Sequence, residues 1–101
     1  MPTEFQQLVW SATRQIPKGF VATYGQIARK IGKPHASRAV GAALKINPDA
    51  PHTPCHRVVA ADGSLTGYSA PGGINTKREL LQSEGVIFIG NKVDLSRSLL
   101  K

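Results

Sequence analysis

Apolar residues in the first part of the chain recur at intervals of three and four, which is the spacing of amphipathic helices. Thr3 and Gln6 form a capping-box pattern at the start of the first helix, and a Pro-Lys-Gly sequence at residues 17–19 ends it. The apolar stripe of this helix consists of Phe5, Leu8, Val9, Ala12 and Ile16. We therefore predict a helix over residues 4–16 with one face in a core.

Two shorter helices are predicted next. A second capping box, formed by Thr23 and Gln26, starts a helix that Gly32 stops, and residues 33–35 make a turn. The third helix should run from about residue 36 to 46, with inward-facing residues Ala39, Val40, Ala43 and Leu44. Two short helices joined by a tight turn indicate a helix-turn-helix over about residues 23–46. An ordinary helical hairpin would give the same pattern.

The second half of the chain has a different pattern. Residues 47–54 hold three prolines and cannot be helical. Residues 57–60 predict a short strand, Asp62-Gly63 a turn, and residues 67–73 a loop. Asn75 or Thr76 would cap a fourth helix that ends at Gly85, and residues 86–93 resemble a small hairpin around Gly90. The predicted fold class is mainly α with a small β component.

Length and composition narrow the class of protein. A chain of 101 residues with 41% hydrophobic residues fits one small folded domain, which we expect to span residues 1–101. Its longest apolar run falls short of the roughly 18 residues of a membrane span, and its first residues lack a secretory signal pattern. A single cysteine fits a reducing compartment. We expect an intracellular protein, cytoplasmic in a bacterium or archaeon and nuclear in a eukaryote.

The positive charge is confined to one part of the chain. The formal net charge is +7, from 13 Lys and Arg against 6 Asp and Glu. Residues 5–48 contain no acid and carry Arg14, Lys18, Arg29, Lys30, Lys33, Arg38 and Lys45. A one-sided positive field favours a polyanionic partner, most simply nucleic acid, although a basic face can also serve solubility alone.

The chemistry of the chain is concentrated at residues 54–57, a Pro-Cys-His-Arg sequence. A cysteine reacts as the thiolate, and His56 can take the proton of Cys55 while Arg57 adds positive charge. A small buried hydrophobe is the usual alternative for a lone cysteine. A zinc site built from Cys55 with the histidines at positions 35, 52 and 56 is disfavoured, because zinc sites show two well-spaced ligand pairs. We expect no metal.

Short motifs on both sides of Cys55 stand in a fixed order. They are Tyr-Gly-Gln-Ile-Ala at 24–28, Arg-Ala-Val-Gly-Ala-Ala at 38–43, Asn-Pro at 47–48, Pro-Cys-His-Arg-Val at 54–58, Gly-Tyr-Ser at 67–69 and Leu-Leu-Gln-Ser-Glu-Gly at 80–85. In sequence and order they resemble the O6-alkylguanine-DNA alkyltransferases, suicide DNA-repair proteins. The resemblance covers about residues 5–86. It implies a winged-helix-like domain containing a helix-turn-helix, with an active-site loop at about residues 47–58.

The resemblance also implies catalytic roles. Cys55 would attack the O6-alkyl carbon of guanine, once and irreversibly. His56 would act as its base through a water molecule, and Glu84 would orient the histidine. Tyr24 would contact the flipped guanine and help protonate it as it leaves. The pocket residues implied by the family are Val58, whose carbonyl and that of Cys55 accept from the guanine amine, Tyr68, which lines the pocket, and Ser69, whose N–H meets O6.

The resemblance places double-stranded DNA with an alkylated guanine against the third helix. That helix would enter the minor groove, where small residues allow a close approach: Ala36, Ala39, Gly41 and Ala42. Arg38 would enter the base stack where the guanine had been, and Asn47 would brace the turn before the cysteine loop. The protein would act as a monomer, and no cofactor is implied, because the cysteine itself accepts the alkyl group.

Two departures from the family keep other functions open. The family usually has a separate N-terminal domain, which these residues do not include; short relatives, the alkyltransferase-like proteins, bind alkylated DNA without repairing it and commonly have tryptophan in place of the cysteine. Ala70 and Pro71 are inserted after the Tyr-Ser pair, which bears on the alkyl groups tolerated. The alternatives are a non-enzymatic damage sensor, a helix-turn-helix transcription factor and a metal-dependent or thiol hydrolase.

Overall fold

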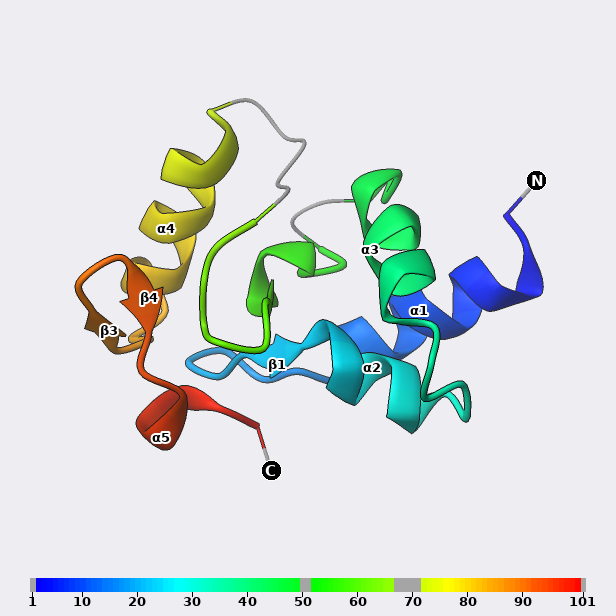
Figure 1. The fold of residues 1–101 in the computed structure, drawn as a ribbon. Helices are drawn as coiled ribbons and strands as arrows, with labels where there is room; N and C mark the ends of the chain where they lie inside the picture. Colours follow the sequence, from blue (N-terminus) through cyan, green and yellow to red (C-terminus); the bar gives the residue numbers. More distant parts are fainter. Residues whose placement is uncertain (1, 50–51, 67–71, 101) are drawn as a thin grey trace.

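The structure, a computed structural model, describes residues 2–49, 52–66 and 72–100. The elements run in the order α1 (Glu4–Arg14), β1 (Ala22–Thr23), α2 (Tyr24–Lys30), α3 (Ser37–Lys45), the 3₁₀ helix η1 (Cys55–Arg57), β2 (Val58–Val59), α4 (Gly73–Ser83), β3 (Phe88–Ile89), β4 (Lys92–Val93) and α5 (Leu95–Ser98). Helices α1, α2 and α3 lie at one end, and α4, α5 and the β3–β4 hairpin lie at the other, with η1 between them (Figure 1). The predicted mainly α fold class is confirmed.

Both predicted capping boxes are present. The hydroxyls of Thr3 and Thr23 each accept from a backbone N–H at 3.1 Å, and the side chains of Gln6 and Gln26 accept in return from the threonine N–H groups. These bonds satisfy backbone donors that a helix leaves unpaired in its first turn. The sequence therefore located the starts of α1 and α2 correctly.

Helices α1, α2 and α3 share one core. Its fully or nearly fully buried members include Val9, Ile27, Ala28, Val40 and Ala43. Trp10 links α1 to α3, because its indole N–H donates to the carbonyl of Ala43 at 2.9 Å. Ala39, expected to face inward, is exposed, because the buried face of α3 runs through residues 40, 43 and 44. The short connection between α2 and α3 confirms the predicted helix-turn-helix.

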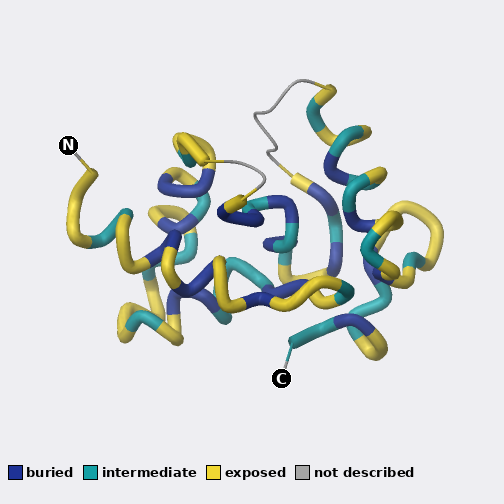
Figure 2. Tube along the Cα trace, turned by 180° about the vertical axis from the view of Figure 1, so that it is seen from behind, coloured by how far each residue is buried: buried dark blue, intermediate teal, exposed yellow. Residues whose placement is uncertain are grey.

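A second core joins the two ends of the molecule. It contains Val21, Val59, Leu65, Leu81, Val86 and Val93. β1 pairs with β2 in parallel, with Ala22 opposite Val58, so the chain just before α2 is fixed beside the chain just after η1. Figure 2 shows this central region as largely buried. The strand predicted at residues 57–60 exists as two residues, and its partner was not predicted.

Helix α4 begins earlier than expected. Its N-cap is Gly72, at a φ of +90°, and Asn75 and Thr76 lie within the helix, so the prediction that one of them caps it was wrong. Glycine adopts this left-handed conformation without the steric cost of a Cβ, which allows the chain to turn into α4 there. The hairpin at β3 and β4 is confirmed.

The last residues of the chain, after β4, return to the first half of the molecule. Asp94 caps α5, and Leu100 then donates its N–H to the carbonyl of Val21 at 2.8 Å. Gln26, the capping-box residue of α2, donates its amide to the carbonyl of Leu100 at 2.7 Å. Neither α5 nor this contact was predicted. Over the residues that the structure describes, no helix has the length and apolar character needed to cross a membrane.

Candidate active site

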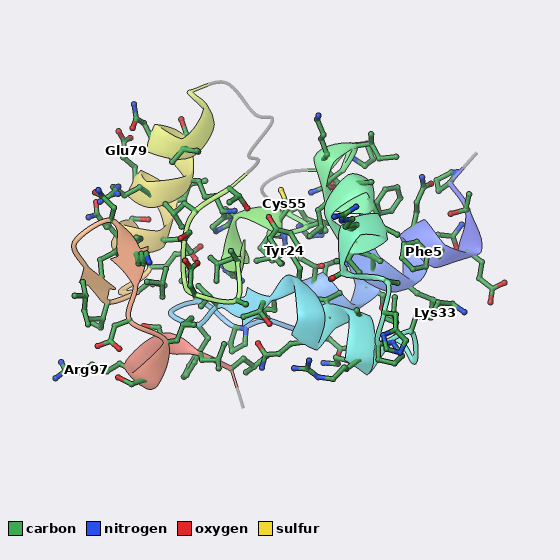
Figure 3. All side chains as sticks on the ribbon, in the orientation of Figure 1. Phe5, Tyr24, Lys33, Cys55, Glu79 and Arg97 are labelled. Atoms are coloured by element: carbon green, nitrogen blue, oxygen red, sulfur yellow. The ribbon has the colours of Figure 1, made fainter. Side chains whose placement is uncertain are left out.

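Cys55 is the first residue of η1 and is partly exposed. Its backbone N–H donates to the carbonyl of Thr53 at 2.8 Å, and its carbonyl accepts from the N–H of Val58. The side chain packs against the edge of the core formed by α1, α2 and α3. In Figure 3 Cys55 and Tyr24 both lie in the middle of the molecule, between α3 and α4. The thiol is thus held on a short, hydrogen-bonded turn rather than sealed inside the fold.

His56 is buried and paired with Glu84. Its Nε2 lies 3.0 Å from Oε2 of Glu84, and its Nδ1 is buried with no hydrogen-bond partner among the described residues. Burial lowers the pKa of His56 below its ordinary 6.5, and this effect outweighs the hydrogen bond and charge of Glu84, which raise it. The charges of Arg57 and Lys77 lower it further. At neutral pH His56 is therefore a neutral imidazole, the form that can accept a proton.

Glu84, the C-cap residue of α4, accepts from two side chains of the cysteine loop. One is His56; the other is Arg57, which donates hydrogen bonds from Nε to Oε1 at 2.9 Å and from Nη2 to Oε2 at 2.7 Å. Burial raises the pKa of the Glu84 carboxyl, but the hydrogen bonds from Arg57 and His56 lower it more, and the net pKa lies below the ordinary value. Arg57 was expected to favour the thiolate of Cys55; its guanidinium is instead engaged with this carboxylate.

Lys77 is a buried cation that sequence reasoning missed. It is 1% exposed, and its Nζ donates to the carbonyls of Val58 at 2.8 Å and Thr66 at 2.9 Å. Burial lowers the pKa of Lys77 to about 8, although the charge of Cys55 acts to raise it. The ammonium therefore lies where it attracts an ionised sulfur. The spacing of residues in α4 could have predicted its burial: Lys77 precedes Leu81 by four residues and Glu84 by seven, which places it on the inward face of the helix.

Tyr24, the first residue of α2, lies at a hollow of about 390 Å³. The hollow is lined by Tyr24, Ser37, Arg38, Gly41, Lys45 and Thr66. The Tyr24 hydroxyl lies 3.1 Å from Oγ1 of Thr66, so Thr66, which also lines the hollow, orients the tyrosine. A Cβ on Gly41 would meet the Tyr24 ring at 3.8 Å, which places this glycine of α3 directly beside the ring.

The outer face of α3 carries the residues expected to meet DNA. Arg38, Ala39 and Ala42 are exposed, while Ala36 and Gly41 are partly exposed. Apart from Arg38, these residues have small side chains, which a helix needs if it is to approach another backbone closely.

Asn47 connects the end of α3 to the cysteine loop. Its Nδ2 donates to the carbonyl of Thr53 at 2.9 Å, and its Oδ1 accepts from the N–H of Asp49 at 3.0 Å. The same Thr53 carbonyl accepts from the N–H of Cys55. Asn47 and the backbone of Cys55 therefore share one acceptor, and Asn47 helps to fix the chain just before the reactive residue.

The remaining expected site residues fall into three groups. Val58 is buried, and its carbonyl, expected to meet guanine, accepts from Lys77. Tyr68 and Ser69 lie outside the described residues, as do Ala70 and Pro71. His35 and His52 are exposed, and the described part of the chain contains no group of three or more His, Cys, Asp or Glu side chains that could hold a metal ion.

A family model and the curated relatives of this chain both point to the same family. Residues 4–86 match the family model described as 6-O-methylguanine DNA methyltransferase, DNA binding domain. The methylated-DNA–protein-cysteine methyltransferase of Methanosarcina acetivorans is 54% identical over 83 residues, which is 82% of this chain and 52% of that protein. The Mycobacterium tuberculosis protein of the same name is 56% identical over 82 residues, 81% of this chain and 48% of that protein. The chain spans about half the length of the curated relatives it matches.

Solved structures add a relative of matching length. A crystal structure of Mycobacterium tuberculosis OGT in complex with DNA superimposes with a TM-score of 0.80 at 48% identity, covering 98% of this chain and 54% of that one. Atl1 of S. pombe, in complex with damaged DNA containing O6-carboxymethylguanine, gives a TM-score of 0.87 at 34% identity and covers 100% of this chain and 99% of its own.

Proposed function

The chain belongs to the 6-O-methylguanine DNA methyltransferase family, which it matches over that family's DNA-binding domain, and from this premise we propose that it repairs alkylated DNA directly. The alkyl group would pass from O6 of guanine to the sulfur of Cys55. One observation carries the proposal: a partly exposed cysteine adjoins a buried histidine whose Nε2 is paired with a carboxylate and whose Nδ1 has no partner among the described residues. This is the arrangement of a nucleophile, a base and an orienting group.

The reaction needs no component beyond the protein and the DNA. His56 takes the thiol proton of Cys55, directly or through water, and the sulfur attacks the alkyl carbon. A carbon–sulfur bond forms as the bond from that carbon to O6 breaks, and the electron pair leaves with guanine. Tyr24 supplies a proton toward the departing base. Because the thioether is stable, each molecule reacts once, and the protein itself is the acceptor.

The target base must leave the double helix, since a thiolate cannot reach O6 inside the stack. We infer that the exposed face of α3 enters the minor groove and that Arg38 fills the space left by the base. Arg38 lines the same hollow as Tyr24, the residue assigned to the flipped guanine, and this proximity supports the role proposed for Arg38. The partner is then alkylated duplex DNA bound by a monomer, inside the cell.

A second candidate function is recognition of damage without repair. It is favoured by the likeness to Atl1, because that likeness extends over 100% of this chain and 99% of Atl1. The Atl1 structure was solved with damaged DNA. Against it stands Cys55, since the alkyltransferase-like proteins commonly have tryptophan at that position. The two functions share the DNA-binding face and differ only in whether the sulfur reacts.

Mass spectrometry separates these functions. The protein is mixed with duplex DNA bearing O6-methylguanine and then digested, and the mass of the peptide containing Cys55 is measured. A gain of one methylene mass, absent from Cys55→Ser, supports transfer; tight binding with no gain supports the sensor. Binding to one undamaged sequence, unaffected by Cys55→Ser, would point to a transcription factor. Release of alkyl product over many turnovers would point to a hydrolase.

A further inference from the structure

Arg57 holds the Glu84 carboxylate with more contacts than His56 does. Its Nε and Nη2 donate to the two carboxylate oxygens, at 2.9 and 2.7 Å, in the side-by-side geometry that suits a guanidinium and a carboxylate. Oε2 is shared, because it also lies 3.0 Å from Nε2 of His56. The orientation of the carboxylate that His56 meets is therefore set by Arg57.

The third nitrogen of Arg57 fixes the guanidinium itself. Nη1 donates to the carbonyl of Ile16, just beyond the end of α1, at 2.7 Å. The side chain therefore ties together the cysteine loop, the end of α1 and the end of α4. Lysine has one nitrogen in place of this planar fork and cannot make the three contacts in the same geometry.

This arrangement determines which nitrogen of His56 carries the proton. An ionised carboxylate only accepts hydrogen bonds, so Nε2 must donate to Glu84 and Nδ1 keeps its lone pair. Nδ1 is the buried atom with no partner among the described residues. If Glu84 could turn or take a proton, either nitrogen of the ring could carry hydrogen, and the base would be present only part of the time.

We propose that Arg57 is a positioning residue for alkyl transfer: it clamps Glu84 as an ionised, fixed acceptor and so keeps His56 in the form that bears its proton on Nε2 and accepts on Nδ1. This rests on the proposed function for its effect on rate, but the state of His56 is a property of the protein alone. Sequence reasoning assigned Arg57 to the cysteine, and its contacts assign it to the base.

The charge of Arg57 acts in the same direction. It partly cancels the Glu84 carboxylate, and it lowers the pKa of His56 together with burial and Lys77. The charged side chains that act on His56 are those of Glu84 and Lys77, from α4 and its C-cap, and of Arg57, from η1. From α1, Arg14 reaches the same loop but donates to Thr53. Removal of the Arg57 charge leaves the carboxylate facing His56 with less compensation, so the imidazole should hold a proton at higher pH.

Three variants test the proposal. Arg57→Met removes both the planar guanidinium and its charge, whereas Arg57→Lys keeps only the charge. Arg97→Met is the matched control, since Arg97 is an exposed arginine whose Nε lies 3.5 Å from Oδ2 of Asp94. The ¹⁵N NMR signals of His56 are followed against pH without DNA, and single-turnover transfer is measured on DNA bearing O6-methylguanine. Thermal unfolding and DNA affinity confirm that each variant is folded and binds.

In the wild type we expect one dominant Nε2–H signal. Arg57→Met should mix the two ring forms, shift the His56 titration and the low-pH limb of transfer to higher pH, and slow transfer about tenfold or more at neutral pH. Arg57→Lys should keep the titration near that of the wild type and recover part of the rate. Should Arg57→Met not fold, Arg57→Lys alone must still show mixed ring forms.

An unchanged ring form and titration in Arg57→Met, or equal effects of Arg57→Met and Arg97→Met, would overturn the positioning role. If the wild type transfers no alkyl group at all, the proposed function fails, while the NMR experiment still decides whether Arg57 sets the state of His56.

Discussion

Lys77 places an ammonium group in the interior of a small protein, between α4 and the chain that leaves β2. Two carbonyl acceptors compensate it in part, those of Val58 and Thr66. Burial still disfavours the charged form, so the pKa of Lys77 falls from an ordinary 10.5 to about 8. Natural proteins accept such a cost where the charge has a use, and here the charge faces the region of Cys55.

The lowered pKa of Lys77 predicts how the free energy of unfolding changes with pH. Between pH 8 and 10.5 the unfolded chain binds the Lys77 proton and the folded chain does not, so the unfolding free energy must rise with pH. Relative to Lys77→Met, the wild type should gain as much as about 3 kcal/mol across this window. Denaturant titrations at several pH values measure it. The exposed Lys92→Met should track the wild type; a difference between wild type and Lys77→Met that stays flat with pH would contradict the prediction.

Arg38 combines exposure on α3 with a place on the wall of the hollow beside Tyr24. Arg38→Ala should slow transfer from duplex DNA by about tenfold or more, because base flipping costs a few kcal/mol and each 1.4 kcal/mol is tenfold. Reaction with the free base O6-methylguanine, which needs no flipping, should stay within about twofold. Single-turnover assays on both substrates make the comparison, and equal losses would remove the assigned role.

At the scale of elements, the position of Tyr24 depends on how α2 begins. The capping box of Thr23 and Gln26 fixes the first turn, β1 fixes the preceding residues against β2, and the C-terminal segment holds Gln26 through Leu100. The tyrosine that faces Thr66 is therefore oriented by contacts from distant parts of the chain.

Two equivalent caps allow this to be tested. Thr23→Ala and Thr3→Ala each remove one capping hydroxyl, and each should cost about 1 kcal/mol of stability. Only Thr23→Ala should slow alkyl transfer, because only α2 begins with Tyr24. Chemical denaturation and single-turnover transfer are measured on both. A similar rate for the two variants would mean that the cap does not position the tyrosine.

At the scale of the molecule, the excess charge belongs to one end. Residues 5–48, which hold the basic excess and no acid, build α1, α2 and α3, whereas Glu84 and Asp94 belong to the other end (Figure 1). A surface charged in this way follows phosphates and releases counterions when it binds.

Binding to duplex DNA should therefore weaken steeply with salt. If three phosphates are contacted, affinity should fall about 40-fold between 50 and 200 mM monovalent salt. Reaction with the free base O6-methylguanine serves as the control and should hardly change. Fluorescence anisotropy of labelled DNA gives the slope, and a flat response would count against the assigned face.

Local rules were enough for much of this protein. The periodicity of apolar residues, two capping boxes and glycine stops predicted α1, α2, α3 and the hairpin, because these features depend on neighbours a few residues apart. The motifs around Cys55 identified the family. The start of α4 was misplaced, because Gly72 turns the chain by its own backbone conformation where a side-chain cap was expected.

The amino-acid sequence by itself determined the helices, the charged half and the reactive residue, since each is written in adjacent or regularly spaced positions. Only the tertiary structure decided that Arg57 turns to Glu84, that Lys77 is buried, and that the chain end returns to Gln26. The first and last of these contacts join residues 27 and 74 positions apart, and the second depends on burial. Both are set by packing of the whole chain rather than by any local pattern.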